Sequence, residues 1–239
     1  MVLRFVDEIR KDEPRVGTRK LRHRLKKNYG IRVGRDWLFG LLRKSNRLVK
    51  VKKSFQKTTY SQHSYVVAPN RIKELSITNP HQVLVADCTY LRLVGRKFAY
   101  LFLVTDAYTR MIVGFHLSRD LSHYSAVIAL ENAVSRMPDP RGVIHHSDRG
   151  CQYCCHEFLA VLRAHEMVSS MTDANHCYQN AVAERVNGIL KDEFSLDAEF
   201  RTFEQLRAAV VHAIMVYNTK RTHWSLDLLT PEEMYEQAA

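Results

Sequence analysis

The sequence has no long hydrophobic run and no glycine-rich loop of the kind that cradles nucleotide phosphates. Its longest strongly apolar stretch, Phe98 to Val104, is about seven residues, whereas a membrane span needs about twenty. Arg4, Asp7 and Glu8 precede any long apolar stretch, so no signal peptide is visible. These absences predict a soluble, cytoplasmic protein that does not depend on ATP.

Cysteine is sparse and irregularly placed. The five cysteines are odd in number, and Cys154 and Cys155 are adjacent, which is poor material for a disulfide framework and typical of a reducing compartment. A zinc site is an alternative, since Cys and His recur at short spacings. Because 154–156 begins an expected helix, its adjacent side chains do not all converge on one ion. The cluster comprises Cys151, Cys154, Cys155, His156, His176 and Cys177.

Negative charge is scarce in the first third of the chain. The 239 residues contain 36 Lys and Arg against 25 Asp and Glu, a net charge of +11. Residues 1–79 hold 21 of the basic and 6 of the acidic residues, whereas residues 80–239 hold 15 and 19. This asymmetry predicts a polyanion-binding arm joined to a domain of a different kind.

The basic arm has a helical pattern over residues 1–50. Leucines recur at helical spacing, as at Leu21 and Leu25, and Gly30 separates two such runs. Two short helices around a glycine-bearing turn predict a helix-turn-helix DNA-binding domain, with a basic helical bundle of no such role as the alternative. Residues 51–79 have linker composition. The cations expected to contact DNA are Arg19, Lys20, Arg35 and Arg43.

From residue 80 the pattern changes to short apolar runs alternating with helical segments. Three runs with tight connections predict an antiparallel meander. The order β-β-β-α-β-α-β-α then predicts an α/β domain over 80–239, with a mixed five-stranded sheet flanked by helices and a C-terminal helical segment. Strands are expected at 83–93, 98–105, 111–117, 142–146 and 167–171, and helices at 122–136, 156–165, 180–194 and 203–217.

Three acidic residues stand at unusual places in this pattern. Asp87 interrupts an apolar strand, where Asp is disfavoured. Asp148 follows a short strand, at the edge where α/β proteins place ligands. Glu184 lies in the helix from residue 180, on a polar stripe. Asp106 and Asp173 are rivals for which a turn and a loop role are favoured. The stripe comprises Asn180, Glu184, Asn187 and Lys191.

The segments around the three carboxylates resemble the acidic motifs of insertion-sequence transposases of the DDE superfamily, which includes retroviral integrases. The motifs read VADCTY at 85–90, SDRGCQY at 147–153 and NAVAERVN at 180–187. Thirty-five residues separate Asp148 from Glu184, and Lys191 follows Glu184 by seven. The segments 106–110, 217–231 and the basic 17–48 also resemble the B-subunit type of this family. Cys88 and Cys151 depart from the family pattern. The N-terminal part of the sequence also shows no leucine-zipper heptads.

The resemblance implies a ribonuclease H-like core and a transposase that cleaves and joins DNA at the ends of an insertion sequence. It implies that Asp87, Asp148 and Glu184 hold two Mg²⁺ ions, for which Mn²⁺ would substitute, and that Asp87 bridges both. Water attacks first and the freed 3′-hydroxyl second. Lys191 and Asn187 are expected to contact DNA near the cleaved end.

The same resemblance implies the partners of the chain. They are transposon-end and target DNA, further copies of the chain assembled on DNA, and an upstream helix-turn-helix protein, with association to the bacterial nucleoid. Two alternatives stay open at this point. One is a related metal-dependent nuclease that cuts without joining, and the other is a DNA-binding protein without enzymatic activity.

Overall fold

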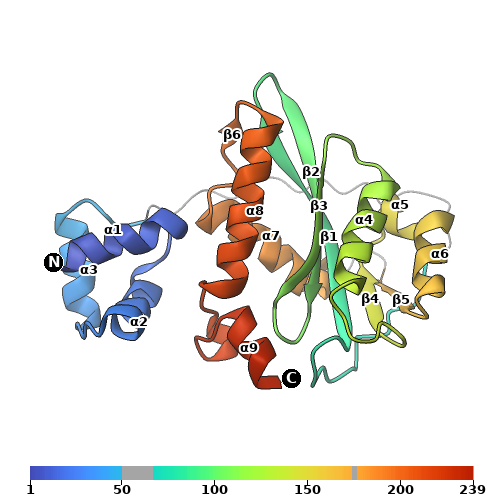
Figure 1. The fold of residues 1–239 in the computed structure, drawn as a ribbon, viewed down its shortest axis with the longest axis horizontal. Coiled ribbons are helices and arrows are strands. Elements are labelled where there is room, and N and C mark those ends of the chain that lie inside the picture. The colour runs from blue at the N-terminus through green and yellow to red at the C-terminus, as the bar shows by residue number, and fades with distance from the viewer. Residues whose placement is uncertain (50–66, 174–176, 239) are drawn as a thin grey trace.

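The computed structural model describes residues 1–49, 67–173 and 177–238. Figure 1 shows a small helical domain beside a larger α/β core. The helices of the small domain are α1 (Val2–Asp12), α2 (Thr18–Tyr29) and α3 (Arg35–Lys44). The strands are β1 (Val83–Leu93), β2 (Lys97–Asp106), β3 (Ile112–Ser118), β4 (Ile144–Ser147), β5 (Val168–Met171) and β6 (Glu199–Phe200). The core helices are α4 (His123–Val134), α5 (Cys151–Cys154), α6 (His156–Ala164), α7 (Ala181–Glu193), α8 (Phe203–Thr219) and α9 (Pro231–Ala238), with 3₁₀ turns η1 (Cys177–Asn180) and η2 (Trp224–Leu226).

The N-terminal domain forms a hydrophobic core of its own. Leu21 and Leu25 of α2 are fully buried together with apolar residues of α3, as the leucine spacing predicts. The structure adds a third helix, because Val6 and Ile9 of α1 pack into the same core. Gly30 ends α2 in the left-handed conformation that glycine adopts at no steric cost. Most of the predicted linker lies outside the described residues.

The five-stranded mixed sheet expected from the sequence is confirmed, with strand order β3-β2-β1-β4-β5. β1, β2 and β3 form the antiparallel meander, whereas β4 pairs in parallel with both β1 and β5. The two-residue strand β6 was not predicted. It pairs in parallel with the end of β1, where Arg92 lies opposite Glu199, and makes the sheet six-stranded. The parallel pairing of β1 and β4 is the feature that brings distant acidic residues to one edge of the sheet.

Helices cover both faces of this sheet (Figure 1). On one face, α4, α5 and α6 bury the apolar side chains of β1 and β2, including Phe102. On the other face, α7 and α8 enclose a second core around Leu101 and Tyr217. Gly114 permits α4 to approach β3 closely, because a Cβ there would lie 2.2 Å from the carbonyl oxygen of Ala129. None of the helices in the described parts of the chain is long and apolar enough to cross a membrane.

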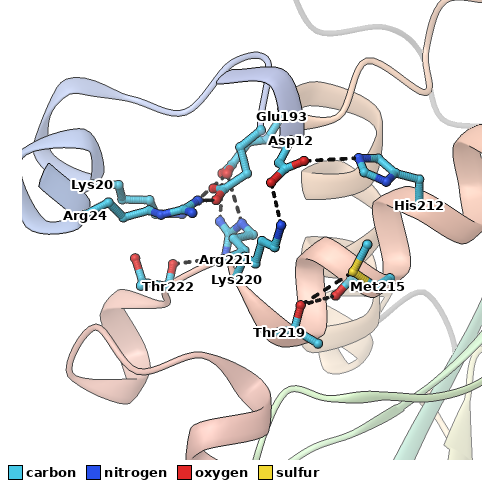
Figure 2. Close-up of polar contacts among 11 residues, drawn as sticks. Asp12, Lys20, Arg24, Glu193, His212, Met215, Thr219, Lys220, Arg221 and Thr222 are labelled. Carbon is cyan, nitrogen blue, oxygen red and sulfur yellow. Dashed lines mark hydrogen bonds and ion pairs between the residues drawn. The ribbon is translucent and has the colours of Figure 1, made fainter. Parts of the chain in front are cut away.

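Ion pairs join the N-terminal domain to the core (Figure 2). Glu193, the last residue of α7, accepts two hydrogen bonds from the Arg221 guanidinium, at 2.7 and 2.9 Å. Lys20 of α2 lies 3.4 Å from the same carboxylate. Asp12 of α1 pairs with Lys220 at 2.6 Å. The two domains therefore meet through charged side chains, several of which are largely buried.

Candidate active site

Asp87 lies in the middle of β1 with its side chain half-buried. Its Oδ1 accepts a hydrogen bond from the Cys88 backbone N–H at 2.9 Å, and its Oδ2 accepts one from Asn187 Nδ2 at 2.8 Å. Asn180 Nδ2 donates to the backbone oxygen of Ala86 at 2.9 Å. Two asparagines thus fasten α7 across β1 at the position of Asp87.

Asp148 is the first residue after β4, the parallel neighbour of β1. Ser147 at the end of β4 pairs in register with Ala86, so the next position along each strand is an aspartate. The Gly150 backbone N–H donates to Asp148 Oδ1 at 3.0 Å and fixes the carboxyl in a tight turn. Asp87 and Asp148, which are distant in sequence, are therefore neighbours at the point where β4 ends beside β1.

The two aspartates repel each other electrostatically. Burial, together with the negative charges of Asp148 and Glu184, raises the pKa of Asp87 from its ordinary 3.8 to about 7, against the hydrogen bonds from Cys88 and Asn187. Like charges held close in a low-dielectric setting favour the protonated acid. A carboxyl whose pKa is strongly raised by burial and by like charges is typical of functional sites.

Glu184 lies in the first turn of α7 and is exposed. It acts on the pKa of Asp87, so it belongs to the same region as the two aspartates. The stripe it shares is not a solvent-facing surface. Asn180 and Asn187 are only 2% and 7% exposed, because their amides are used by Ala86 and Asp87.

Lys191 stands two turns further along the same stripe. It is partly buried, and burial lowers its pKa against the opposing attraction of Asp87. The structure therefore places a cation on the Asp87 side of α7.

The two rival aspartates, Asp106 and Asp173, accept hydrogen bonds that hold the chain around them in place. Asp106 is fully buried, and its Oδ1 accepts hydrogen bonds from the backbone N–H groups of Tyr108 and Thr109 and from the Thr109 hydroxyl. Its Oδ2 accepts from the His81 backbone N–H at 2.6 Å. Asp173 accepts from Gln179 Nε2 at 2.8 Å. Asp106 stabilises the turn after β2, and Asp173 holds a loop.

The oxygen atoms of the three carboxylates are the kind of ligand that a divalent cation binds. Mg²⁺ and Mn²⁺ prefer hard oxygen ligands, and Asp87, Asp148 and Glu184 offer only such atoms. Among residues 1–49, 67–173 and 177–238, no three His, Cys, Asp or Glu side chains are gathered closely enough to hold a metal ion. Glu184 is the exposed member of the three.

Comparison with known proteins identifies the family. Two integrase core domain models match residues 77–177 and residues 165–231. An uncharacterized 31 kDa protein of insertion element IS600 from Shigella sonnei is 35% identical to this chain, over 93% of the chain and 83% of that protein. The transposase InsF of insertion sequence IS3A from Escherichia coli K12 is 33% identical, over 80% of the chain and 67% of that protein. This chain belongs to the insertion-sequence transposases of the DDE integrase superfamily.

The transposase also has the fold of solved retroviral integrases. The HTLV-2 integrase catalytic core domain, solved in complex with magnesium, matches with a TM-score of 0.52 and 16% identity, over 66% of this chain and 97% of that one. A chain of the simian T-cell lymphotropic virus intasome in complex with a PP2A regulatory subunit matches with a TM-score of 0.55 and 15% identity, over 92% and 70%. At these identities the likeness establishes the fold.

The cations expected to contact DNA differ in their availability. Arg19, Arg35 and Arg43 of the transposase are exposed on α2 and α3. Lys20 is only 8% exposed and faces Glu193 in the domain junction. Asn187 directs its amide nitrogen to Asp87. The polar groups of Lys20 and Asn187 are thus directed to other parts of the chain, and the DNA contacts of all these residues stay a prediction.

Sequence reasoning missed the junction residues. Glu193 ends a helix whose polar residues were assigned to the site, and Arg221 was noted only as part of a family-like tail. One feature of the sequence could have indicated the role of Glu193, namely its position at the end of a helix. An acidic residue at a helix C-terminus opposes the helix dipole, so Glu193 required a cation partner that the sequence alone does not identify.

Proposed function

We propose that this transposase cleaves DNA strands at the ends of an insertion sequence and joins the freed 3′-hydroxyls to new phosphates, with Asp87, Asp148 and Glu184 as its catalytic carboxylates. The observation that carries the proposal is the adjacency of Asp87 and Asp148 on paired parallel strands, which raises the pKa of Asp87 to about 7 together with burial and Glu184. Membership in the transposase family supplies the reaction class.

Divalent cations fit this donor set. The three side chains present only carboxylate oxygens, and the charge excess around Asp87 favours a bound cation. Asp87, Asp148 and Glu184 would hold the ions, Mg²⁺ or Mn²⁺. When bound, such ions supply Lewis-acid stabilisation of the attacking and leaving oxygens.

The other residues of the site position these ligands. Asn187 orients the carboxyl of Asp87 through Oδ2, and the Cys88 backbone N–H holds Oδ1. The Gly150 backbone N–H fixes the carboxyl of Asp148. Lys191, on the same stripe as Glu184, engages a phosphate or base beside the scissile bond. In the first step the attacking oxygen comes from water and the 3′-oxygen leaves. In the second step that 3′-hydroxyl attacks a target phosphate, and the 3′-oxygen of the target strand leaves as the new phosphodiester forms.

The N-terminal domain would carry most of the duplex binding. Exposed Arg19, Arg35 and Arg43 are suited to phosphate contacts. Further copies of the chain assembled on DNA, and an upstream helix-turn-helix partner, remain part of this proposal.

The test compares Asp87→Asn and Glu184→Gln with the matched control Asp192→Asn. Asp192 is also acidic and is exposed on α7, outside the stripe. Labelled transposon-end DNA and a target plasmid, incubated with Mg²⁺ or Mn²⁺, report cleavage and joining separately. We expect both site variants to lose both products and the control to keep them. Substantial activity of Glu184→Gln would overturn the assignment, and cleavage without joining by the wild type would identify a nuclease.

A further inference from the structure

A basic cleft separates the N-terminal domain from the core on the side of α7 away from the carboxylates. Its volume is about 910 Å³. Arg19 and Arg35 line it from the N-terminal domain, and Arg185 of α7 and Trp224 of η2 line it from the core. Ile189, another lining residue, lies about 140° around α7 from Glu184. We call this feature the interdomain cleft, and it is separate from the proposed catalytic site.

The floor of the interdomain cleft is closed by direct contacts between the domains. The Arg15 backbone N–H donates to the Glu193 backbone oxygen at 3.2 Å, and Lys20 and Arg221 share the Glu193 carboxylate (Figure 2). The Glu193 carboxylate is therefore neutralised within the floor, and Asp36, the other acidic lining residue, pairs with Arg35 at 2.8 Å. The arginines of the walls are available to bind an anionic ligand, because neither Arg19 nor Arg185 forms an ion pair in the described parts of the chain.

Trp224 presents an aromatic surface in this basic setting. Its side chain is 57% exposed, and its loop is held rigidly. The His223 backbone N–H donates to Leu229 O at 2.9 Å, the Leu228 N–H donates to His223 O at 2.8 Å, and Leu226 is buried beneath. The indole is therefore exposed although the backbone hydrogen bonds hold its loop in one conformation. It is a preformed stacking surface.

The volume of the cleft limits which polyanions it can bind. Pockets of about 300–1,000 Å³ enclose ligands of drug size, so the interdomain cleft has room for about two nucleotides and none for a duplex. A second hollow of about 510 Å³ shares Arg19, Arg35 and Trp224 with it and continues the path along α2. Cationic grooves with aromatic side chains bind single strands, because every base has a face that can stack.

We propose that the interdomain cleft holds a short unpaired stretch of DNA, with a base stacked on Trp224 and a phosphate contacted by Arg185. Frayed nucleotides at a cleaved end, or beside it, have this chemistry. The proposal concerns binding without metal, so it stands or falls independently of the catalytic assignment.

The two tryptophans of the chain, Trp37 and Trp224, allow a direct measurement. In the full-length Trp37→Phe variant, Trp224 is the only indole, and stacking on a base quenches its emission. With a chelator present, a short single-stranded oligothymidylate should quench this emission saturably, and a blunt duplex of equal length should quench it far less. The reciprocal Trp224→Phe variant, which reports from Trp37, should show little quenching by the single strand.

Substitutions then test the contacts. Trp224→Ala and Arg185→Ala should each weaken single-strand binding, measured by fluorescence anisotropy of a labelled strand, by roughly tenfold. Trp224→Phe and Arg185→Lys should retain most of it. Arg207→Ala, an exposed arginine of α8 outside the cleft, should leave it unchanged. Absence of quenching in the Trp37→Phe variant, equal quenching by the duplex, or equal quenching by an acidic peptide would overturn the proposal.

Discussion

Helix α7 carries two acidic positions that the fold treats in opposite ways. Near its start, Glu184 is exposed and acts electrostatically on Asp87, whose pKa rises to about 7 from burial and from its acidic neighbours. At its end, burial alone would raise the pKa of Glu193, but Arg221 and Lys20 outweigh it and hold that pKa below the ordinary value. One region concentrates negative charge, and the other neutralises it.

The contrast separates a structural carboxylate from those that we propose to be functional. Glu193 is satisfied by partners within the chain and joins two domains. The carboxylates around Asp87 receive hydrogen bonds that orient them, yet their mutual repulsion is retained. Such a region destabilises the fold on its own and is expected to be stabilised by what it binds.

The largest expected effect comes from removing one charge of the repelling pair. Asp148→Asn should lower cleavage by roughly a thousandfold or more, because a metal ligand is lost. The same change should raise the free energy of unfolding in metal-free buffer by about 1 kcal/mol, since the repulsion on Asp87 is relieved. Product formation and urea denaturation measure the two effects, and a destabilised Asp148→Asn chain would contradict the comparison.

At the other end of α7, removing a negative charge should lower the free energy of unfolding rather than raise it. Glu193→Gln leaves Arg221, whose side chain is 3% exposed, without its anion, and should lower the free energy of unfolding by about 3 kcal/mol. Cleavage at low temperature should fall far less than in Asp148→Asn. Denaturation and cleavage by the same preparations provide the measurement. A stable but inactive Glu193→Gln enzyme would place this residue in the catalytic machinery instead.

A smaller effect is expected at Lys191. Lys191→Ala should raise the concentration of transposon-end DNA needed for half-maximal cleavage by about tenfold, because a phosphate contact is lost. The rate at high DNA concentration should recover in large part, since the carboxylates are intact. Cleavage rate as a function of DNA concentration gives both quantities. A curve that matches the wild type would make Lys191 an ordinary surface lysine.

The last expected effect is on stability alone and concerns Lys20. Burial lowers the pKa of Lys20 from 10.5 to about 8 despite the attraction of Glu193. Between those pH values the unfolded chain binds more protons than the folded one, so the free energy of unfolding of the wild type should rise as the pH increases from about 8 to about 10.5. Lys20→Met should lack this rise and should change stability little at neutral pH. Urea denaturation of both proteins at about pH 8 and about pH 10 tests this.

The sequence predicted the sheet well because its signals are local. Apolar runs of the right length define β1, β2 and β3, and Gly95 with Arg96 marks their first turn, where both residues have positive φ. The helix α1 was harder to separate within a basic helical region. The strand β6 has only two residues, too few for any periodicity.

The candidate site was predicted at the level of the backbone, whereas its side-chain partners were not. Asp87 was noted inside a strand, Asp148 after a strand and Glu184 on a helix stripe, and the family resemblance joined them into one predicted site. The sequence does not say that Asn187 bonds to Asp87. Lys20 was expected to contact DNA because it lies among other cations. Its partner Glu193 is 173 residues away along the chain, and only the folded structure reveals such a pair.

The parallel pairing of β1 with β4 has a consequence for the order of events during synthesis. A chain leaves the ribosome from its N-terminus, and domains fold as they emerge. The N-terminal helices share a core drawn from their own residues, so they are complete before β1 appears. Asp148 must wait for β4, and Glu184 follows only after β5. A growing chain therefore exposes its basic helices early, and all three carboxylates have been synthesised only when translation of the core is nearly finished.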